Sequence, residues 1–435
     1  MSDTRIAEVR GRRVWDSRGR PTVEVDVTLR GGVFGRAIAP AGASMGSGEA
    51  VDLRDGGAKL GGYDVGRAVA AVNGEIATAL AGMDAADQAS VDQRMIVLDG
   101  TANKARLGGN AIVATSMAVL HAAAAANGVP LWRHLAQGRK VRLPLPEIQI
   151  FGGGAHAARR VDIQDFMVMC PGAASFAQAL EWTAEVYLAA GHLMKQAGKL
   201  QGVADEGGYW PAFRSNEEAL DTLMAAIRKA GFAGGDDVAI SLDVAASEFG
   251  ANGSYTLALD GRKLDTAAMI EMLGKWCDAY PIISIEDPVA EDDAEGFIAF
   301  TRAYGARCQV IGDDFLVTNA ARVNKAAADD AATAVLVKPN QAGTVTETKA
   351  ALDAGKATGF GTIVSARSGE TEDITIVHLA VGWDAGQLKV GSFSRSERMA
   401  KWNECLRIEE ALGRDAVFAG GSALGFRRQH EEKPA

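Results

Sequence analysis

The stretch Val238-Ala239-Ile240-Ser241-Leu242-Asp243 decides the fold, because it is a short apolar run that stops at a single acidic residue. Five more such runs follow at intervals of about 20 to 45 residues, separated by helix-length segments, which is the rhythm of a parallel α/β barrel. Each run ends at a polar position: 282–285 before Glu286, 310–312 before Asp313, 334–337 before Lys338, 362–365 before Ala366 and Arg367, and 387–388 before Lys389.

The polar residues that end these runs are expected to meet at one mouth of the barrel. The carboxyl ends of parallel barrel strands converge there, and this is where the active sites of such barrels lie. A barrel with a purely structural role needs no charge at these positions, so solvated strand ends are the weaker interpretation. Three acids and two lysines would then share one pocket: Asp243, Glu286, Asp313, Lys338 and Lys389.

Three carboxylates at close range repel one another unless a cation compensates them, so a divalent metal is predicted. Oxygen-only ligation favours Mg²⁺ or Mn²⁺ over zinc, and the six histidines show no HxxxH or HExxH spacing. A lysine beside such a metal is expected to have a lowered pKa and to act as a base. Lys338 is the candidate for this base.

Composition limits the possible functions. The chain has 435 residues, of which 48% are hydrophobic and 23% charged, as in a folded soluble protein. Its net charge of −10 argues against nucleic acid or an anionic membrane surface as a partner. No signal peptide opens the chain, and four scattered cysteines form no CxxC pair, so a reducing cytoplasmic location is expected. The apolar segment 111–126 is too short to span a bilayer and is expected to be a buried helix.

Two domains are expected. In the first third, the alternating segments 5–13, 22–29 and 33–39 predict strands, and 65–80, 88–98 and 110–127 have helical spacing. A small sheet backed by helices therefore precedes the barrel. The basic, proline-containing segment 137–146 is the best boundary. We expect an α+β capping domain over 1–137 and an α/β barrel with the catalytic site over 138–435.

Motifs along the whole chain resemble those of the enolase family. The resemblance implies an enolase-type modified (β/α)8 barrel with an N-terminal α+β capping domain, assembled as a homodimer or larger homo-oligomer. The motifs occur in the family's order: Asp16-Ser17-Arg18-Gly19, Gly42-Ala43-Ser44, Asp99-Gly100-Thr101, Asp205-Glu206-Gly207-Gly208, Leu242-Asp243-Val244, Ser284-Ile285-Glu286-Asp287, Gly312-Asp313-Asp314, Lys338 with Asn340-Gln341, Arg367-Ser368-Gly369-Glu370-Thr371, and Ser394-Arg395-Ser396-Glu397-Arg398.

The resemblance also implies a role for each matching residue. Lys338 would be the base that removes the α-proton, Lys389 would help to neutralise the enediolate, and Glu206 would be the acid that assists departure of the hydroxyl. A lysine base with a metal-stabilised enediolate is the known pattern of enolase-superfamily sites. The remaining implied assignments are Asp243, Glu286 and Asp313 as ligands of the first Mg²⁺, Ser44 on a mobile loop that closes over the substrate and completes a second Mg²⁺ site, Gln164 and His156 lining the substrate site, and Arg367 and Ser368 binding phosphate.

Several residues of the same pocket depart from the family pattern. Enolases read His-Arg-Ser where this chain has Ala366-Arg367-Ser368, and Gln-Glu-Phe where it has Gln164-Asp165-Phe166. The shorter Asp165 retracts a carboxylate that works beside Glu206, and its position matters for proton transfer. The loops also differ, with Met45 in place of threonine and with two arginines, Arg159 and Arg160, after His156. Arg159 is a candidate for substrate binding, although a solvated basic pair is also possible.

These departures spare the predicted metal ligands and base, which suggests a repurposed reaction. An enlarged and more cationic pocket would accept a substituted phosphoryl or phosphonyl carboxylate, as in the enolase-like carboxyphosphonoenolpyruvate synthases of phosphinate biosynthesis. No P-loop or GxGxxG fingerprint identifies a nucleotide donor. One alternative is a working enolase that dehydrates 2-phosphoglycerate to phosphoenolpyruvate, and another is a non-catalytic binding protein with this fold.

Overall fold

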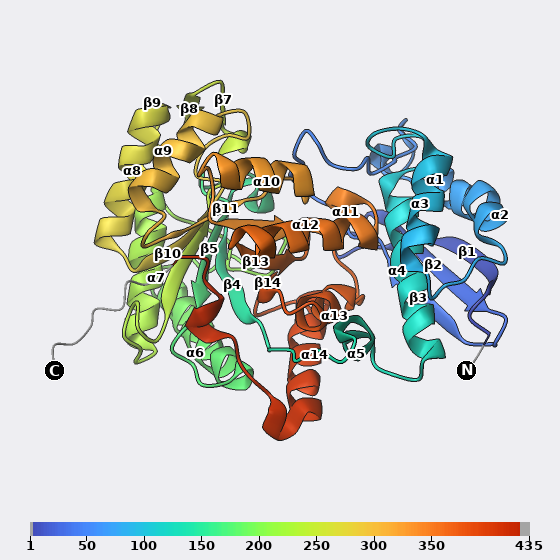
Figure 1. The fold of residues 1–435 in the computed structure, drawn as a ribbon. Coiled ribbons are helices and arrows are strands. Elements are labelled where there is room, and N and C mark those ends of the chain that lie inside the picture. Colours follow the sequence, from blue (N-terminus) through green and yellow to red (C-terminus); the bar gives the residue numbers. More distant parts are fainter. Residues whose placement is uncertain (1–2, 427–435) are drawn as a thin grey trace.

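The computed structural model describes residues 3–426, and the tail of the predicted 138–435 domain beyond 426 lies outside the described residues. Figure 1 shows the N-terminal elements on one side of the molecule and the barrel on the other. An antiparallel sheet of order β1-β2-β3 forms the first layer of the capping domain, with β1 (Ile6–Trp15), β2 (Pro21–Leu29) and β3 (Phe34–Ile38). The three strands predicted in the first third of the sequence are confirmed.

Helices cover one face of this sheet. The predicted helix over 65–80 is one helical segment in which a wider π turn at Val72–Ile76 separates two α-helices. The helices of this layer are α1 (Gly66–Ala71), α2 (Ala77–Leu80), α3 (Gln88–Asp99), α4 (Gly109–Ala126) and α5 (Leu131–Ala136). The fold class predicted from the sequence, an α+β domain before a barrel, is therefore confirmed.

Helix α4 forms the centre of the capping domain. The helix is two residues longer than the apolar segment 111–126, so the expectation that it is too short to cross a membrane was wrong: it is long and apolar enough by length and composition. However, 83% of its apolar window is buried against the protein. Strand β3 approaches it closely at Gly35, where an added Cβ would lie 2.2 Å from the backbone nitrogen of Ala122 and 2.3 Å from the carbonyl oxygen of Ala118. The expected buried helix is confirmed, and only a glycine fits at this contact.

The second domain is a closed barrel of eight strands. Their order around the barrel is β10-β11-β12-β13-β14-β4-β5-β6. Strand β5 runs antiparallel to both of its neighbours, β4 and β6, while the other pairs are parallel. The strands are β4 (Leu145–Gly152), β5 (Asp165–Met169), β6 (Ala239–Asp243), β10 (Ile282–Glu286), β11 (Gln309–Gly312), β12 (Ala334–Val337), β13 (Gly361–Ser365) and β14 (Gly386–Ser392).

The six strands that the sequence rhythm predicts are β6 and β10 to β14. The long interval between Asp243 and Glu286 arises because a small sheet of order β7-β8-β9 is inserted there, with β7 (Gly250–Ala251), β8 (Ser254–Thr256) and β9 (Lys263–Asp265). Strands β4 and β5 were not predicted. A hairpin replaces a helical crossover between them, as antiparallel strands permit, and this breaks the repeat.

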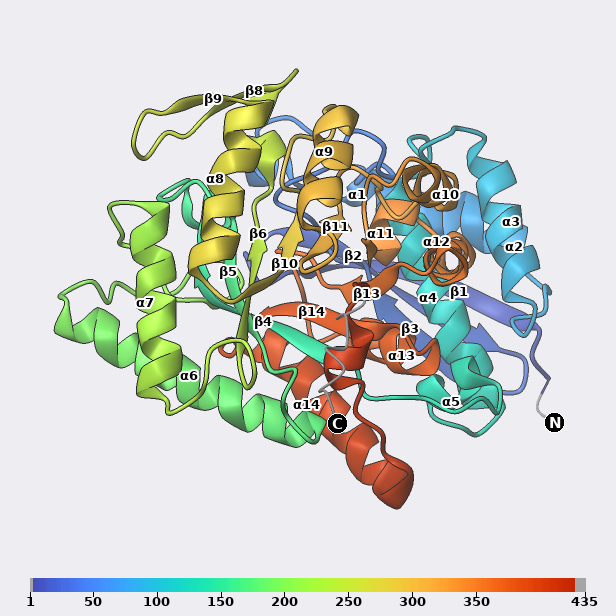
Figure 2. The ribbon, with the colours of Figure 1, turned by 60° about the vertical axis from the view of Figure 1, so that its left-hand side comes forward.

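The barrel helices surround the strands, and Figure 2 shows α10 and α12 on the side of the capping helices and α6 and α7 on the far side. Polar N-cap side chains begin several of these helices, such as Ser215 before α7 and Thr344 before α12. The helices are α6 (Phe176–Gln196), α7 (Asn216–Lys229), α8 (Thr266–Ala279), α9 (Ala294–Tyr304), α10 (Ala320–Ala328), α11 (Pro339–Ala342), α12 (Val345–Thr358), α13 (Thr375–Gly382) and α14 (Ser396–Leu412).

The loop 41–49 of the capping domain, which we call the capping loop, reaches the barrel mouth. Ala41 forms a two-way backbone bridge with Gly369, with N–O distances of 2.9 and 2.8 Å. We propose the domain boundary between residues 137 and 138. Gln137, in a left-handed conformation, directly follows α5, and the connection runs from there to β4.

Candidate active site

One closed pocket lies where the barrel strands end beneath the capping loop. Its volume of about 20 Å³ leaves room for a single water molecule. The pocket brings together ten of the residues predicted for the site, and Ala366 also lines it. The lining residues are Ser44, His156, Gln164, Asp165, Glu206, Asp243, Lys338, Ser365, Ala366, Arg367, Ser368, Lys389 and Val390.

Each of the two lysines is paired with predicted metal ligands, Lys389 with two of them and Lys338 with one. Lys389 Nζ lies 2.9 Å from Asp243 Oδ2 and 2.7 Å from Glu286 Oε2. Lys338 Nζ is paired with the carboxylate of Asp313. Each side chain is buried, so these ion pairs are weakly screened. The strand ends therefore converge as the sequence predicted.

The charge state of Lys338 in this structure follows from its carboxylate neighbours, and the lowered pKa expected beside a bound metal stays a prediction. Burial disfavours the ammonium form, yet the carboxylates of Asp313 and Glu286 together outweigh this effect and raise the pKa of Lys338 above its ordinary value. The expected lowering assumed that a cation would be the nearest charge. In this structure, the nearest charge is the Asp313 carboxylate.

The donor set fits a hard divalent cation. Burial and the neighbouring Asp243 raise the pKa of Glu286 well above its usual range, as expected for a carboxylate short of positive charge. Its second oxygen, Oε1, is buried and has no hydrogen-bond partner within residues 3–426. Oxygen donors of this kind suit Mg²⁺. Asp313 also groups with Asp287 and Asp314, whose carboxylate oxygens lie within 4.8 Å of one another and of Asp313.

His156 is held between two carboxylates on another wall of the pocket. Its Nδ1 lies 2.9 Å from Asp165 Oδ1, and its Nε2 lies 3.0 Å from Ser368 Oγ and 3.6 Å from Glu206 Oε1. Burial opposes a charged imidazole, but Asp165 and Glu206 prevail and raise the pKa of His156 to about 9. The imidazolium overcomes the effect of burial on Asp165 and lowers its pKa to about 2. The His156 imidazole on this wall therefore holds a proton at neutral pH.

Asp165 lies at the start of its strand, β5, and not at the end of a strand, where the predicted metal ligands and lysines were expected. Because β5 is reversed, its first residue lies at the mouth, paired in register with Asp243 at the end of β6. The Asp165 carboxylate accepts hydrogen bonds from His156 and Gln149. Its second oxygen lies 3.7 Å from Lys389 Nζ. The shortened acid is thus fixed by its neighbours and contacts both walls of the pocket.

Arg367 joins the capping loop to the barrel. Its Nη1 donates to Glu49 Oε2 at 2.8 Å, and its Nη2 donates to the carbonyl of Ser44 at 2.7 Å. The loop comes so close that a Cβ on Gly42 would lie 2.0 Å from Nη2. Arg398, fully buried, donates to the carbonyls of Arg367 and Ser368 and fixes this turn.

Arg159 lies apart from the pocket. Its side chain is 68% exposed and pairs with Glu248 at 2.9 Å. A contact between Arg159 and a substrate therefore stays a prediction, and in this conformation the solvated basic pair describes it better. Met45, the other loop departure, is 63% exposed.

Sequence reasoning missed several residues that order the site. Glu49 and Gln149 carried no recognised motif, and Gln341 was noted only as part of one. Asp287 accepts from the backbone N–H groups of Asp313 and Asp314, at 2.9 and 2.8 Å, and so shapes the turn that carries a predicted ligand. Only Asp287 offered a positional signal in the sequence, because it directly follows the predicted ligand Glu286.

A barrel whose mouth gathers buried carboxylates, two lysines and a carboxylate-held histidine defines an enzyme of acid–base chemistry on a small anionic substrate. Residues 6–135 match the family model "Enolase, N-terminal domain", and residues 140–426 match "Enolase, C-terminal TIM barrel domain". The chain is 50% identical over 421 residues to "Enolase 1" of Desulfitobacterium hafniense (strain Y51), covering 96% of each protein. The chain belongs to the enolase family and is an enzyme of the lyase class.

Proposed function

We propose that the enzyme removes water from a phosphorylated three-carbon acid of the 2-phosphoglycerate type, giving an enol phosphate of the phosphoenolpyruvate type. The observation that carries this proposal is the closed pocket in which Lys338 and Lys389 share one enclosure with the His156–Glu206 pair. The similarity to a relative named enolase supports it.

In this proposal, the neutral amine of Lys338 accepts the α-proton, which requires a cation on Asp313 to offset the carboxylates that raise the pKa of Lys338 in this structure. Lys389 places positive charge beside the enediolate oxygens. Glu206 supplies the proton that leaves with the β-hydroxyl, and His156 holds Glu206 in place. Gln164 lines the substrate site and donates to Asp243 Oδ2 at 3.1 Å. Arg367 and Ser368 bind the phosphate.

A bound Mg²⁺ would supply the positive charge that neutralises the substrate carboxylate as the α-proton leaves. Asp243, Glu286 and Asp313 would hold the first ion, and Ser44 on the capping loop would contribute to the second. The unpartnered Glu286 Oε1 supports the first assignment.

The test is the Lys338→Ala variant. With the wild-type enzyme, we expect 2-phosphoglycerate to be converted to phosphoenolpyruvate and its α-proton to exchange with solvent. In Lys338→Ala, both should fall by about 10²–10⁴-fold, the usual contribution of a general base. If exchange were unchanged while substrate still bound, Lys338 would not be the base.

A second candidate reaction rests on Ala366. This residue lines the pocket where an imidazole stands in other enolases, and so leaves space beside Arg367. Asp165, the shortened acid, is fixed by His156 and Gln149. Both features would suit a bulkier phosphoryl or phosphinyl substrate, as in a carboxyphosphonoenolpyruvate synthase. The named relative favours dehydration over this reaction.

The double variant Ala366→His with Asp165→Glu separates the two candidates. If the pocket is adapted to a bulkier substrate, the wild type should dehydrate 2-phosphoglycerate about 10²–10⁴-fold more slowly than ordinary enolases. The double variant should then recover part of the rate. Wild-type turnover on the order of 10–10² per second would exclude the adaptation. The synthase reaction also requires product from a nucleotide-activated phosphonoformate donor.

We also propose that the enzyme assembles as a homodimer or larger homo-oligomer in the cytoplasm. Trp15 and Phe34, on the edge strands of the capping sheet, are 53% and 57% exposed, which suits a contact between subunits. The four cysteines are buried and not in disulfides, in keeping with a reducing compartment. Light scattering of the purified protein measures the assembly, and a monomer would contradict it.

A further inference from the structure

Gln341 occupies the point where the barrel, the capping loop and a strained turn meet. It lies on the short helix α11, and its side chain is buried. Its amide nitrogen donates to Asp313 Oδ1 at 2.9 Å and to Glu49 Oε1 at 3.3 Å. Its backbone carbonyl accepts from the N–H of Ala50 at 2.8 Å. Gln341 therefore contacts the predicted metal ligand Asp313, Glu49 at the end of the capping loop, and Ala50 directly after the loop.

Thr318 fixes the orientation of this amide. Its hydroxyl donates to Gln341 Oε1 at 2.6 Å, which leaves the amide nitrogen facing the two carboxylates. The Thr318 hydroxyl oxygen also accepts a hydrogen bond from the backbone N–H of Lys338 at 2.9 Å. Thr318 thus links the amide orientation to the backbone of the proposed base.

The backbone at Thr318 is strained. Val317 and Thr318 have φ angles of 42° and 51°, in the left-handed region that β-branched residues rarely adopt. Conformations of this kind persist where the surrounding structure holds them, and they concentrate at functional sites. Here the hydrogen bonds of the Thr318 side chain to Gln341, Leu336 and the Lys338 backbone hold the turn, together with the backbone bond from Val317 N–H to the Asp313 carbonyl.

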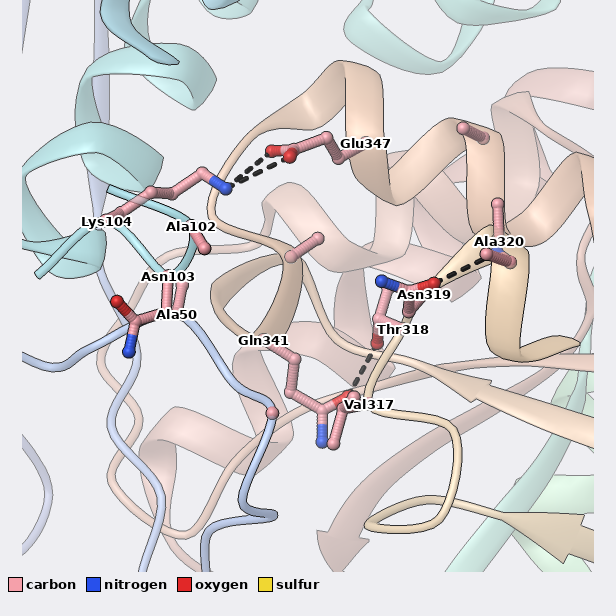
Figure 3. Close-up of a pocket in the computed structure, with 14 residues that line it drawn as sticks. Ala50, Ala102, Asn103, Lys104, Val317, Thr318, Asn319, Ala320, Gln341 and Glu347 are labelled. Atoms are coloured by element: carbon pink, nitrogen blue, oxygen red, sulfur yellow. Dashed lines mark hydrogen bonds and ion pairs between the residues drawn. The ribbon is translucent and has the colours of Figure 1, made fainter. Parts of the chain in front are cut away.

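A cavity at the domain junction lies beside this network. Figure 3 shows Gln341 and Thr318 joined by their hydrogen bond near Ala50, with Lys104 and Glu347 paired elsewhere on the lining. The cavity has a volume of about 230 Å³. Lys104 is engaged by both oxygens of Glu347, at 3.0 and 2.9 Å. This cation is therefore not available to compete for Asp313 or Glu49.

Both oxygens of Asp313 are engaged, because Oδ1 accepts from Gln341 and Oδ2 faces Lys338. When a cation binds Asp313, the Gln341 amide is the neutral contact that can keep the carboxylate in place. The same amide nitrogen also contacts Glu49, which holds Arg367.

We propose that Gln341 is a positioning residue that sets the orientation of Asp313 for Mg²⁺ and ties the metal site to closure of the capping loop through Glu49. The proposal rests on the assignment of Asp313 as a Mg²⁺ ligand. It predicts that removing the amide donor changes the metal affinity and the loop together.

The test compares Gln341→Met with Gln88→Met in the full-length protein. Methionine keeps the length of the side chain but cannot donate. Gln88 is a matched control, because its amide also donates to a carboxylate, Asp92 Oδ1 at 3.0 Å, but in the capping domain. Calorimetric titration with Mg²⁺ alone measures the affinity, and amide hydrogen exchange of residues 41–50 reports on the loop.

In Gln341→Met we expect Mg²⁺ to bind about 10–100-fold more weakly, the usual effect of losing a contact that orients a metal ligand. Exchange of residues 41–50 should become faster, whereas Gln88→Met should match the wild type in both measurements. Wild-type Mg²⁺ affinity in Gln341→Met would overturn the proposal. If the wild type itself bound no Mg²⁺, the metal assignment of the proposed function would fail instead.

Thr318→Val provides a second variant in case Gln341→Met does not fold. Valine keeps the β-branched shape and removes the hydroxyl, which both orients the amide and accepts from the backbone N–H of Lys338. We expect weaker Mg²⁺ binding and faster exchange of residues 41–50 than in the wild type. If a folded Thr318→Val protein kept the wild-type Mg²⁺ affinity and the wild-type exchange rates of residues 41–50, the Gln341 amide would need no orienting by Thr318. That result would overturn the proposed connection between Thr318, Gln341 and the metal site.

Discussion

His156 is a buried base held between two acids, and this placement makes part of the stability depend on pH. The folded-state pKa of about 9 lies above the ordinary value of 6.5, so the protonated form is favoured by folding. The contribution is complete below pH 6.5 and is lost as the pH rises towards and through 9. A shift of this size corresponds to on the order of 3 kcal/mol.

The prediction is tested with His156→Gln. Between pH 6 and 9.5, the free energy of unfolding of the wild type should fall more steeply than that of His156→Gln, as measured by chemical denaturation. His192→Gln is the control, because His192 is an exposed residue on α6. Parallel pH profiles for the wild type and His156→Gln would contradict the buried, charged histidine.

At the level of single residues, the sequence predicted those site residues that end an apolar strand. Asp243 and Glu286 fall into this class, because strand order alone brings them together. Lys389 follows a predicted apolar run but lies in the middle of β14, which continues to Ser392. Glu49 and Gln341 could not be found in this way, since their roles depend on how the capping loop lies on the barrel. Arg159 follows no strand in this way, and because its side chain is exposed and paired with Glu248, its contact with a substrate stays a prediction.

At the level of elements, the contact between β3 and α4 fixes the capping domain. An added methyl at Gly35 would meet the backbone of α4, which cannot move as a side chain can. We therefore expect Gly35→Ala to lower the free energy of unfolding by about 1–3 kcal/mol or more, the cost of overpacking. Thermal or chemical denaturation measures this change.

Gly74→Ala is the matched control for Gly35→Ala. Gly74 lies in the helical segment between α1 and α2, and a Cβ there would meet no atom within 4 Å. Because alanine is the better helix former, Gly74→Ala should be neutral or stabilising by up to about 1 kcal/mol. Equal destabilisation by both variants would show that the β3–α4 contact is not as tight as described.

The parallel strands that follow one repeat could be predicted from the sequence, but the reversed strand β5 could not. Strands β6 and β10 to β14 follow one pattern, a buried run before a polar residue, and the sequence showed it. Strand β5 begins with its functional residue, Asp165, because the strand is reversed. A rule that looks for polar residues at the ends of strands cannot find a site residue at the start of one.

At the level of the whole molecule, the site is shared between two domains. The capping loop supplies Ser44 and Glu49, while the barrel supplies Lys338, Lys389 and Arg367. The sequence indicated both domains, and the family resemblance implied a mobile loop in the capping domain. It could not give the closed arrangement, which depends on long-range contacts such as the bridge between Ala41 and Gly369.

The closed pocket has a kinetic consequence. A space of about 20 Å³ cannot admit a three-carbon phosphorylated acid, so the protein must visit a more open state before it can capture one. Capture is then a two-step process in which opening precedes the encounter. The observed rate of ligand uptake would level off at high ligand concentration at the opening rate.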